Sequence, residues 1–103
     1  DCPVEPFDLL PNLACAVTRT DPTMPGAKPW HPEQCLSVEE AVRVFTQGAA
    51  YASFEENERG TLSVGKVADF AVLSRDIFTI DPNEIGSSRV EMTVVDGEIA
   101  WEK

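Results

Sequence analysis

Proline placement limits regular structure in the first third of this chain more than any other feature. Seven of the eight prolines lie at or before position 32, and the eighth is Pro82. A proline lacks the amide N–H and clashes with the preceding helical turn, so long helices and inner strands are excluded there. One short helix fits between the breaks, over residues 11–19, and a loop rich in proline and glycine should follow over residues 20–34. A loop of this length in a compact domain is often functional.

Residues 38–54 give the clearest helix signal in the chain. Ser37 can cap the helix, and Glu40, three residues later, completes a capping box. Apolar residues then recur at helical spacing, although the small residues around Gly48 allow a kink. We therefore expect one helix, straight or kinked, that ends before the glycine at position 60.

The pattern changes to β-structure after position 60. A short apolar run at residues 67–73 predicts one strand, and residues 90–95 and 98–102 predict a hairpin. Asp96-Gly97 lies between the two hairpin strands and favours a type I′ turn, whose two central residues take positive φ. Between residues 76 and 86 there is room for one helical turn.

These elements predict an α+β chain whose strands are too few for its helices. On the last strand, alternation places Ile99 and Trp101 on one face. Three strands are near the lower limit for a free-standing sheet, and the apolar stripe of the helix also needs a surface to cover. The imbalance indicates that partner surface is missing from the chain.

Composition excludes several classes of function. The net charge of −10 argues against nucleic-acid binding, which needs clustered Lys and Arg. No apolar run approaches the roughly 18 residues of a membrane span, so we expect a soluble chain. Three cysteines without paired spacing favour a reducing cytoplasm and packed, unreactive thiols. Because the chain opens at Asp1 with no initiator Met, we expect it to be the later part of a longer protein.

Three stretches resemble the amidohydrolase superfamily. Residues 60–73 read Gly-Thr-Leu-Ser-Val-Gly-Lys-Val-Ala-Asp-Phe-Ala-Val-Leu, which is similar to a segment near the C-terminus of these enzymes. The hairpin over residues 94–99 resembles the stretch that follows it there. Residues 1–6, Asp-Cys-Pro-Val-Glu-Pro, resemble the segment after the last barrel strand in the family-3 branch, which includes formamide deformylase-like enzymes.

The resemblance implies a position within a larger fold. Residues 1–59 would be the end of a (β/α)8 barrel, with the loop after strand 8 and the final helices. Residues 60–103 would be the C-terminal strands of a small β-sandwich that is completed by N-terminal strands. The barrel of such enzymes holds one or two divalent metals, usually zinc, and histidines from earlier strands supply most of the ligands.

The same resemblance assigns site residues. Asp1 stands where the strand-8 aspartate would bind metal and take a proton from the attacking water. Trp30 and His31 would line a substrate pocket, although an anchoring role for Trp30 and an exposed, non-functional position for His31 remain open. Lys66 and Asp69 have catalytic side chains, but their place before a strand favours structural roles.

Two functions remain open from the sequence. The first is the C-terminal part of a metal-dependent amidohydrolase that cleaves amide or formamide-type carbon–nitrogen bonds. The chain alone would then be inactive and hold no metal, because its one histidine cannot supply the ligands that the family uses. The alternative is a non-catalytic association module with the same derived fold. In either case we expect the partner to be the missing N-terminal part or another copy of the chain.

Overall fold

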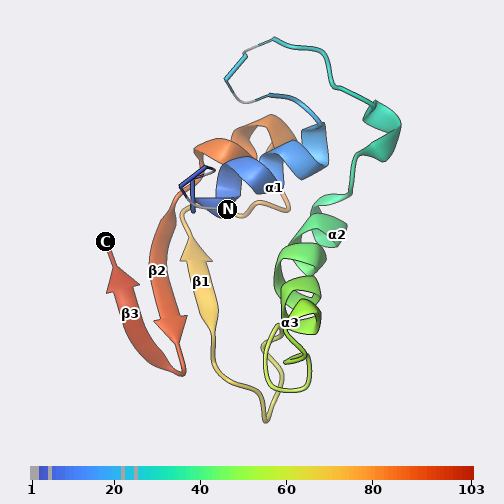
Figure 1. The fold of residues 1–103 in the computed structure, drawn as a ribbon. Coiled ribbons are helices and arrows are strands. Elements are labelled where there is room, and N and C mark those ends of the chain that lie inside the picture. Colours follow the sequence, from blue (N-terminus) through green and yellow to red (C-terminus); the bar gives the residue numbers. More distant parts are fainter. Residues whose placement is uncertain (1–2, 5, 22, 25) are drawn as a thin grey trace. The chain divides into compact units, whose positions relative to one another are not determined.

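The structure, a computed structural model, describes residues 3–4, 6–21, 23–24 and 26–103 (Figure 1). Contacts divide the chain into two compact units. The first comprises Asp1–Ala41 and Asp76–Ser88, and the second comprises Val42–Arg75 and Arg89–Lys103. Each unit therefore joins two stretches that are separated in the sequence. The predicted division at residues 59 and 60 concerns the barrel and sandwich of a larger protein, and it stays a prediction.

Helix α1 (Leu9–Thr18) begins slightly earlier than the sequence suggested. The reason is Asp8, whose Oδ1 accepts a hydrogen bond from the N–H of Leu10 at 3.1 Å and so caps the first turn. The helix ends at Arg19, which adopts the left-handed conformation with φ of 56° and donates its N–H to the last turn. Local capping thus fixes both ends of a helix that the prolines keep short.

The core of the first unit lies where α1 packs against a 3₁₀ segment, η3 (Pro82–Ser87), drawn in orange beside the blue helix in Figure 1. Ile85 of η3 is fully buried, and the other buried apolar side chains of the unit include Leu10, Leu13, Ala14 and Ile77. A Cβ placed on Gly86 would lie 3.5 Å from the Cβ of Ala14, so the two backbones approach closely. The single turn expected between residues 76 and 86 is therefore a packing element.

The predicted helix over residues 38–54 is present, with an irregular centre. It comprises α2 (Val38–Arg43), a π-helical turn, η2 (Val44–Gly48), and α3 (Ala49–Ala52). The capping box is confirmed. The N–H of Ser37 donates to Glu40 Oε2 at 2.8 Å, and the N–H of Glu40 donates to Ser37 Oγ at 3.2 Å. The π-helical turn lies at the small residues around Gly48, where the sequence allowed an irregularity.

The end of α3 brings the following turn back onto the helix. Phe54 takes a left-handed φ of 60°, and the N–H of Glu55 donates to the carbonyl of Ala50 at 2.9 Å. Gly60 then passes so close that an added Cβ would lie 2.9 Å from the Cβ of Ala50 and 3.2 Å from the Cα of Gln47. Its φ of 90° is also one that other residues rarely adopt. Glycine is thus required at this position for two reasons: the backbone has a positive φ, and there is no room for a Cβ.

The strands form one antiparallel sheet in the order β1-β2-β3. Strand β1 (Phe70–Leu73) is shorter than the predicted 67–73, whereas β2 (Val90–Val95) and β3 (Glu98–Glu102) match their predicted ranges. The hairpin turn is confirmed, because Asp96 and Gly97 both have positive φ, 52° and 77°. The three strands therefore follow the chain order as a meander.

A register shift separates Ile99 from Trp101, so the prediction that both lie on one face is wrong. Ile99 pairs with Val94, and Trp101 pairs with Thr93. Val94 and Thr93 are consecutive on β2 and point to opposite faces, and paired residues share a face. The extra residue in β3 acts as a β-bulge, which simple alternation along a strand cannot anticipate.

Replacing Ile85 by alanine tests the packing of η3 on α1. Ile85→Ala should lower the free energy of unfolding by about 2–5 kcal/mol, because it leaves a cavity in a fully buried position. Urea unfolding followed by circular dichroism measures the change. Ile99→Ala is the matched control: the side chain is 59% exposed, and we expect less than about 1 kcal/mol. Equal losses in the two variants would contradict this core.

Replacing Gly60 by alanine tests the close approach to α3. Gly60→Ala should cost about 2–4 kcal/mol, since the left-handed conformation and the contact with Ala50 both penalise a side chain. Gly65→Ala is the control, because Gly65 has a similar φ of 92° but an added Cβ would meet nothing within 4 Å. It should cost only about 1–2 kcal/mol. Indistinguishable unfolding midpoints for the two variants would contradict a steric clash between a side chain at position 60 and Ala50.

Candidate functional site

Trp30 and His31 belong to a cluster of four side chains at the end of the loop that follows α1. The N–H of Trp30 donates to the carbonyl of Arg19 at 2.8 Å, and Arg19 Nε donates back to the carbonyl of Trp30 at 3.0 Å. The guanidinium carbon lies 5.0 Å from the centroid of the indole ring, a cation–π contact. The rings of Trp30 and His31 meet at 85° with centroids 4.5 Å apart. Glu33 completes the cluster through a 2.7 Å contact between its Oε1 and His31 Nδ1.

Two residues of the cluster take a conformation that side chains disfavour. Arg19 and His31 have φ of 56° and 51°, in the left-handed region. Residues other than glycine adopt this conformation at a cost of about 1–3 kcal/mol, and such residues gather at functional sites. For Arg19 the conformation ends α1, and for His31 it precedes a 3₁₀ turn, η1 (Pro32–Gln34).

The carboxyl group of Glu33 is held in its ionised form. Its own backbone N–H, then the imidazole of His31, and more weakly the charge of Arg19 lower the pKa of Glu33 below its usual range. An ionised carboxylate only accepts hydrogen bonds, so the proton shared with His31 is on Nδ1. The ring is therefore oriented, and its Nε2 is the atom left for a further interaction.

Lys66 has a structural role, as the sequence suggested. Its Nζ donates to the carbonyl of Glu56 at 2.6 Å and to the carbonyl of Arg59 at 3.3 Å. These two carbonyls belong to the turn after α3, where no helix or strand supplies them with partners. The ammonium group therefore holds the turn in place, and it does not present itself to a ligand.

Asp69 links the same turn to the hairpin. Its Oδ1 accepts the N–H of Asp96 at 2.9 Å, and its Oδ2 lies 3.5 Å from Nη1 of Arg59. The N–H of Gly97 also donates to the carbonyl of Ala68 at 3.1 Å. The expected structural role of Asp69 is thus confirmed.

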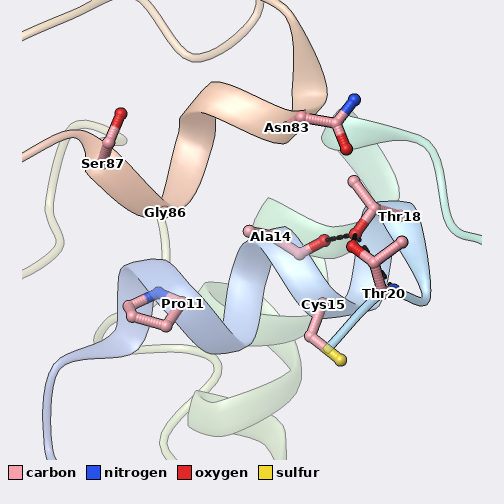
Figure 2. A pocket seen from close by; sticks show the side chains of 8 residues that line it. All are labelled: Pro11, Ala14, Cys15, Thr18, Thr20, Asn83, Gly86 and Ser87. Carbon is pink, nitrogen blue, oxygen red and sulfur yellow. Dashed lines mark hydrogen bonds between the residues drawn. The ribbon is translucent and has the colours of Figure 1, made fainter. Parts of the chain in front are cut away.

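A cavity of about 300 Å³ lies between α1 and η3 in the first unit (Figure 2). Cys15, Thr18 and Thr20 contribute polar atoms to its lining, but the two hydroxyls are already engaged. Thr18 Oγ1 donates to the carbonyl of Ala14 at 2.8 Å and contacts Thr20 Oγ1 at 2.7 Å. Asn83 and Ser87 line the cavity as well, and they also donate within the protein: Asn83 Nδ2 to Asp81 Oδ1 at 2.9 Å and Ser87 Oγ to the carbonyl of Glu84 at 2.8 Å. Most donors in the lining therefore already have a partner in the protein. The sequence offered no signal for it, because its two walls are far apart along the chain.

The remaining candidates do not form a site in the described part of the chain. Asp1, the proposed metal ligand, lies outside the described residues. Among those that the structure does describe, no group of three or more His, Cys, Asp or Glu could hold a metal ion. Cys15 and Cys35 are free and exposed, which contradicts the expectation that they are packed, whereas Cys2 lies outside the described residues. Across the same described ranges, no helix has the length and apolar character needed to cross a bilayer.

Comparison with known proteins gives one consistent result. The profile of a family described as "Amidohydrolase family" matches residues 1–100. The chain is 37% identical over 103 residues to a putative amidohydrolase, YtcJ, of Bacillus subtilis, covering all of this chain and 20% of that protein. It is 36% identical over 81 residues to an N-substituted formamide deformylase of Arthrobacter pascens, covering 79% of this chain and 15% of that protein.

A more distant similarity points the same way. An imidazolonepropionase of Bacteroides thetaiotaomicron is 36% identical over 62 residues, which is 60% of this chain and 15% of that protein. The chain thus spans a fifth or less of the length of these relatives. No solved structure matches it. With a family profile that covers nearly every residue and a relative aligned along the whole chain, this protein belongs to the amidohydrolase family.

Proposed function

We propose that this chain is the C-terminal part of a metal-dependent amidohydrolase that cleaves carbon–nitrogen bonds of non-peptide amides, and that it is inactive by itself. The family match over residues 1–100 carries the proposal. The formamide-type substrate is supported by the 36% identity to a relative named for N-substituted formamides. The length of the relatives supports the view that most of the catalytic machinery lies in sequence that this chain does not contain.

The proposal divides the site between this chain and the rest of the enzyme. Asp1 is proposed as one metal ligand and as the acceptor of a proton from the attacking water, which a bound divalent metal, in this proposal zinc, makes more acidic. The other ligands would come from outside this chain, because the described residues offer no metal-binding group. Trp30 and His31 are proposed to face the substrate.

The chain should also pair with another surface. In the sheet, Ile99 and Trp101 are 59% and 48% exposed, and Phe70 and Val72 are 38% and 42% exposed. Apolar side chains exposed on the strands of a sheet are typical of surfaces that are covered in the assembled protein. We propose that the remaining part of the enzyme covers them. An association module without catalysis is the second candidate, and the same exposed side chains favour it.

A reducing compartment suits the thiols of the chain. Cys15 and Cys35 are both free. Exposed free thiols persist where disulfides are kept reduced, and on this ground we propose a cytoplasmic location.

Asp1 is tested in the complete enzyme. Asp1→Asn should lower kcat for an N-substituted formamide by about 10²–10⁴-fold, because the variant side chain cannot accept the proton of the attacking water. Glu39→Gln is the control, since Glu39 lies exposed in α2 and should leave kcat unchanged. Steady-state kinetics and metal analysis are measured together for both variants.

Two results would contradict the proposal. One is undiminished kcat in the Asp1→Asn enzyme with the control equally active. The other is stoichiometric zinc, or hydrolysis, in the 103-residue chain by itself, because the chain would then contain a complete site.

Self-association of the isolated chain is expected from its exposed strands. Sedimentation velocity at rising concentration should show dimers or larger species. The double substitution Ile99→Lys and Trp101→Lys should shift the chain toward monomer, because it puts charges on both faces of β3. Val64→Lys is the control, at a fully exposed position in a loop before the sheet. A stable monomer at all concentrations would count against an uncovered apolar surface.

A further inference from the structure

The C-terminal end of α1 has an arginine at a position where many helices have glycine. Arg19 directly follows α1, has a φ of 56° and donates its N–H to the carbonyl of Cys15. Glycine adopts this left-handed conformation readily, whereas it is disfavoured for residues with a side chain. The end of the helix therefore does not need the arginine side chain, whose use lies in the contacts that it makes elsewhere.

The side chain of Arg19 contacts Trp30 in two ways. Nε of Arg19 donates to the carbonyl of Trp30 at 3.0 Å, and the guanidinium carbon lies 5.0 Å from the centroid of the indole ring. The N–H of Trp30 donates in return to the carbonyl of Arg19 at 2.8 Å, a backbone bond that does not depend on the residue type at position 19. The arginine side chain thus adds one hydrogen bond and one ring contact to an existing backbone link.

Trp30 begins a short segment that is tied to the end of α1 on both sides. At the other end of the segment, the N–H of Leu36 donates to the carbonyl of Ala16 at 3.1 Å. Between the two ties lie His31, whose ring meets that of Trp30 with centroids 4.5 Å apart, and Glu33, which contacts His31 Nδ1 at 2.7 Å. Helix α1 is itself held by its buried packing on η3. The two ties therefore fix the segment to the core of the first unit.

The loop before Trp30 adds no support of this kind. Between positions 21 and 29, the hydrogen bonds of the described residues join members of the same stretch, Thr23 and Met24 to Asp21 and Ala27 to Met24. These are local turns, and they do not relate the loop to the helix. On the loop side, Trp30 is therefore tied to α1 through Arg19.

We propose that Arg19 is a positioning residue of the enzyme, which holds Trp30, and through it the imidazole of His31, in a fixed place relative to α1. The inference rests on the proposed function, in which Trp30 and His31 face the substrate. Arg19 itself touches no substrate and takes no part in the bonds that are made or broken. A guanidinium suits this task, because one planar group can both donate through Nε and stack on an aromatic ring. Lysine carries the same charge without the plane or the Nε donor.

Arg19→Gly in the complete enzyme separates positioning from support of the fold. Glycine keeps both backbone hydrogen bonds of position 19 and relieves the left-handed conformation, so the thermal unfolding midpoint should change little. Loss of the Nε hydrogen bond and of the ring contact should still raise KM for an N-substituted formamide about 5–20-fold and leave kcat within about twofold. A change confined to KM indicates lost substrate binding, because the chemical step is unaffected.

Two further variants serve as comparisons. Arg19→Lys keeps the positive charge alone, so KM should stay raised by about fivefold or more. Asp96→Gly removes a side chain from another left-handed residue, with φ of 52°, in the exposed turn of the hairpin. It should leave KM unchanged, which excludes a general effect of glycine at such positions. A normal KM in Arg19→Lys, or a raised KM in Asp96→Gly, would overturn the proposal.

A double-mutant cycle tests whether Arg19 acts through the two rings. In an enzyme that carries both Trp30→Ala and His31→Ala, Arg19→Gly should raise KM less than about twofold, because the groups that it positions are gone. An undiminished effect of Arg19→Gly in that background would show that Arg19 meets the substrate directly, and it would overturn the proposal. So would a KM in the single variant Arg19→Gly within about twofold of that of the original enzyme.

A spectroscopic measurement distinguishes failure of this proposal from failure of the proposed function. In the complete enzyme labelled with 5-fluorotryptophan, Trp30→Phe identifies the fluorine resonance of position 30 by its loss. Arg19→Gly should move this resonance toward that of the free amino acid, whereas Asp96→Gly should not. Hydrolysis with a KM and a resonance that ignore Arg19→Gly would reject the positioning role alone. A resonance that moves as expected in an enzyme without hydrolytic activity would reject the proposed function.

Discussion

The second unit depends on two hydrogen bonds that the ammonium group of Lys66 donates. These hydrogen bonds satisfy the carbonyls of Glu56 and Arg59, which would otherwise lie unpaired in the turn after α3. With that turn fixed, Arg59 is placed to meet Asp69, and Asp69 in turn receives the N–H of Asp96. A single cation thus links the end of a helix, through a chain of polar contacts, to the hairpin of the sheet. Lys66 and Asp69, the two charged residues of the segment over residues 60–73 that resembles amidohydrolases, therefore both make structural contacts.

The loop cluster uses the same kinds of group for a different purpose. Lys66 donates to carbonyl groups and its hydrogen bonds point into the protein, whereas Arg19 and His31 keep only one end engaged. Both sets contain residue types that are common in catalytic and binding sites. What separates them is whether the polar atoms are fully used, and this depends on partners that the residue types alone do not reveal.

Local chemistry explains which features were predictable. The capping box at Ser37 and Glu40 and the turn at Asp96-Gly97 involve neighbours in sequence, so residue type alone indicated them. The packing of Gly60 against Ala50 and of η3 against α1 joins residues from separate elements. The bulge that separates Ile99 from Trp101 depends on the pairing register of two strands. For the candidate site, Trp30 and His31 were predicted, whereas their anchors Arg19 and Glu33 appear only in three dimensions.

The interleaved composition of the two units has a consequence for how the chain acquires its structure. Helix α1 lies near the start of the given sequence, but η3, which covers it, lies in the last quarter of the same sequence, and β3 follows η3. Neither unit can therefore be completed on the ribosome before both of its stretches have emerged. Contacts of such long sequence separation favour slow, cooperative folding over stepwise assembly. A nascent chain that stalls before position 82 would expose the apolar side of α1, and it would be a natural target for chaperones.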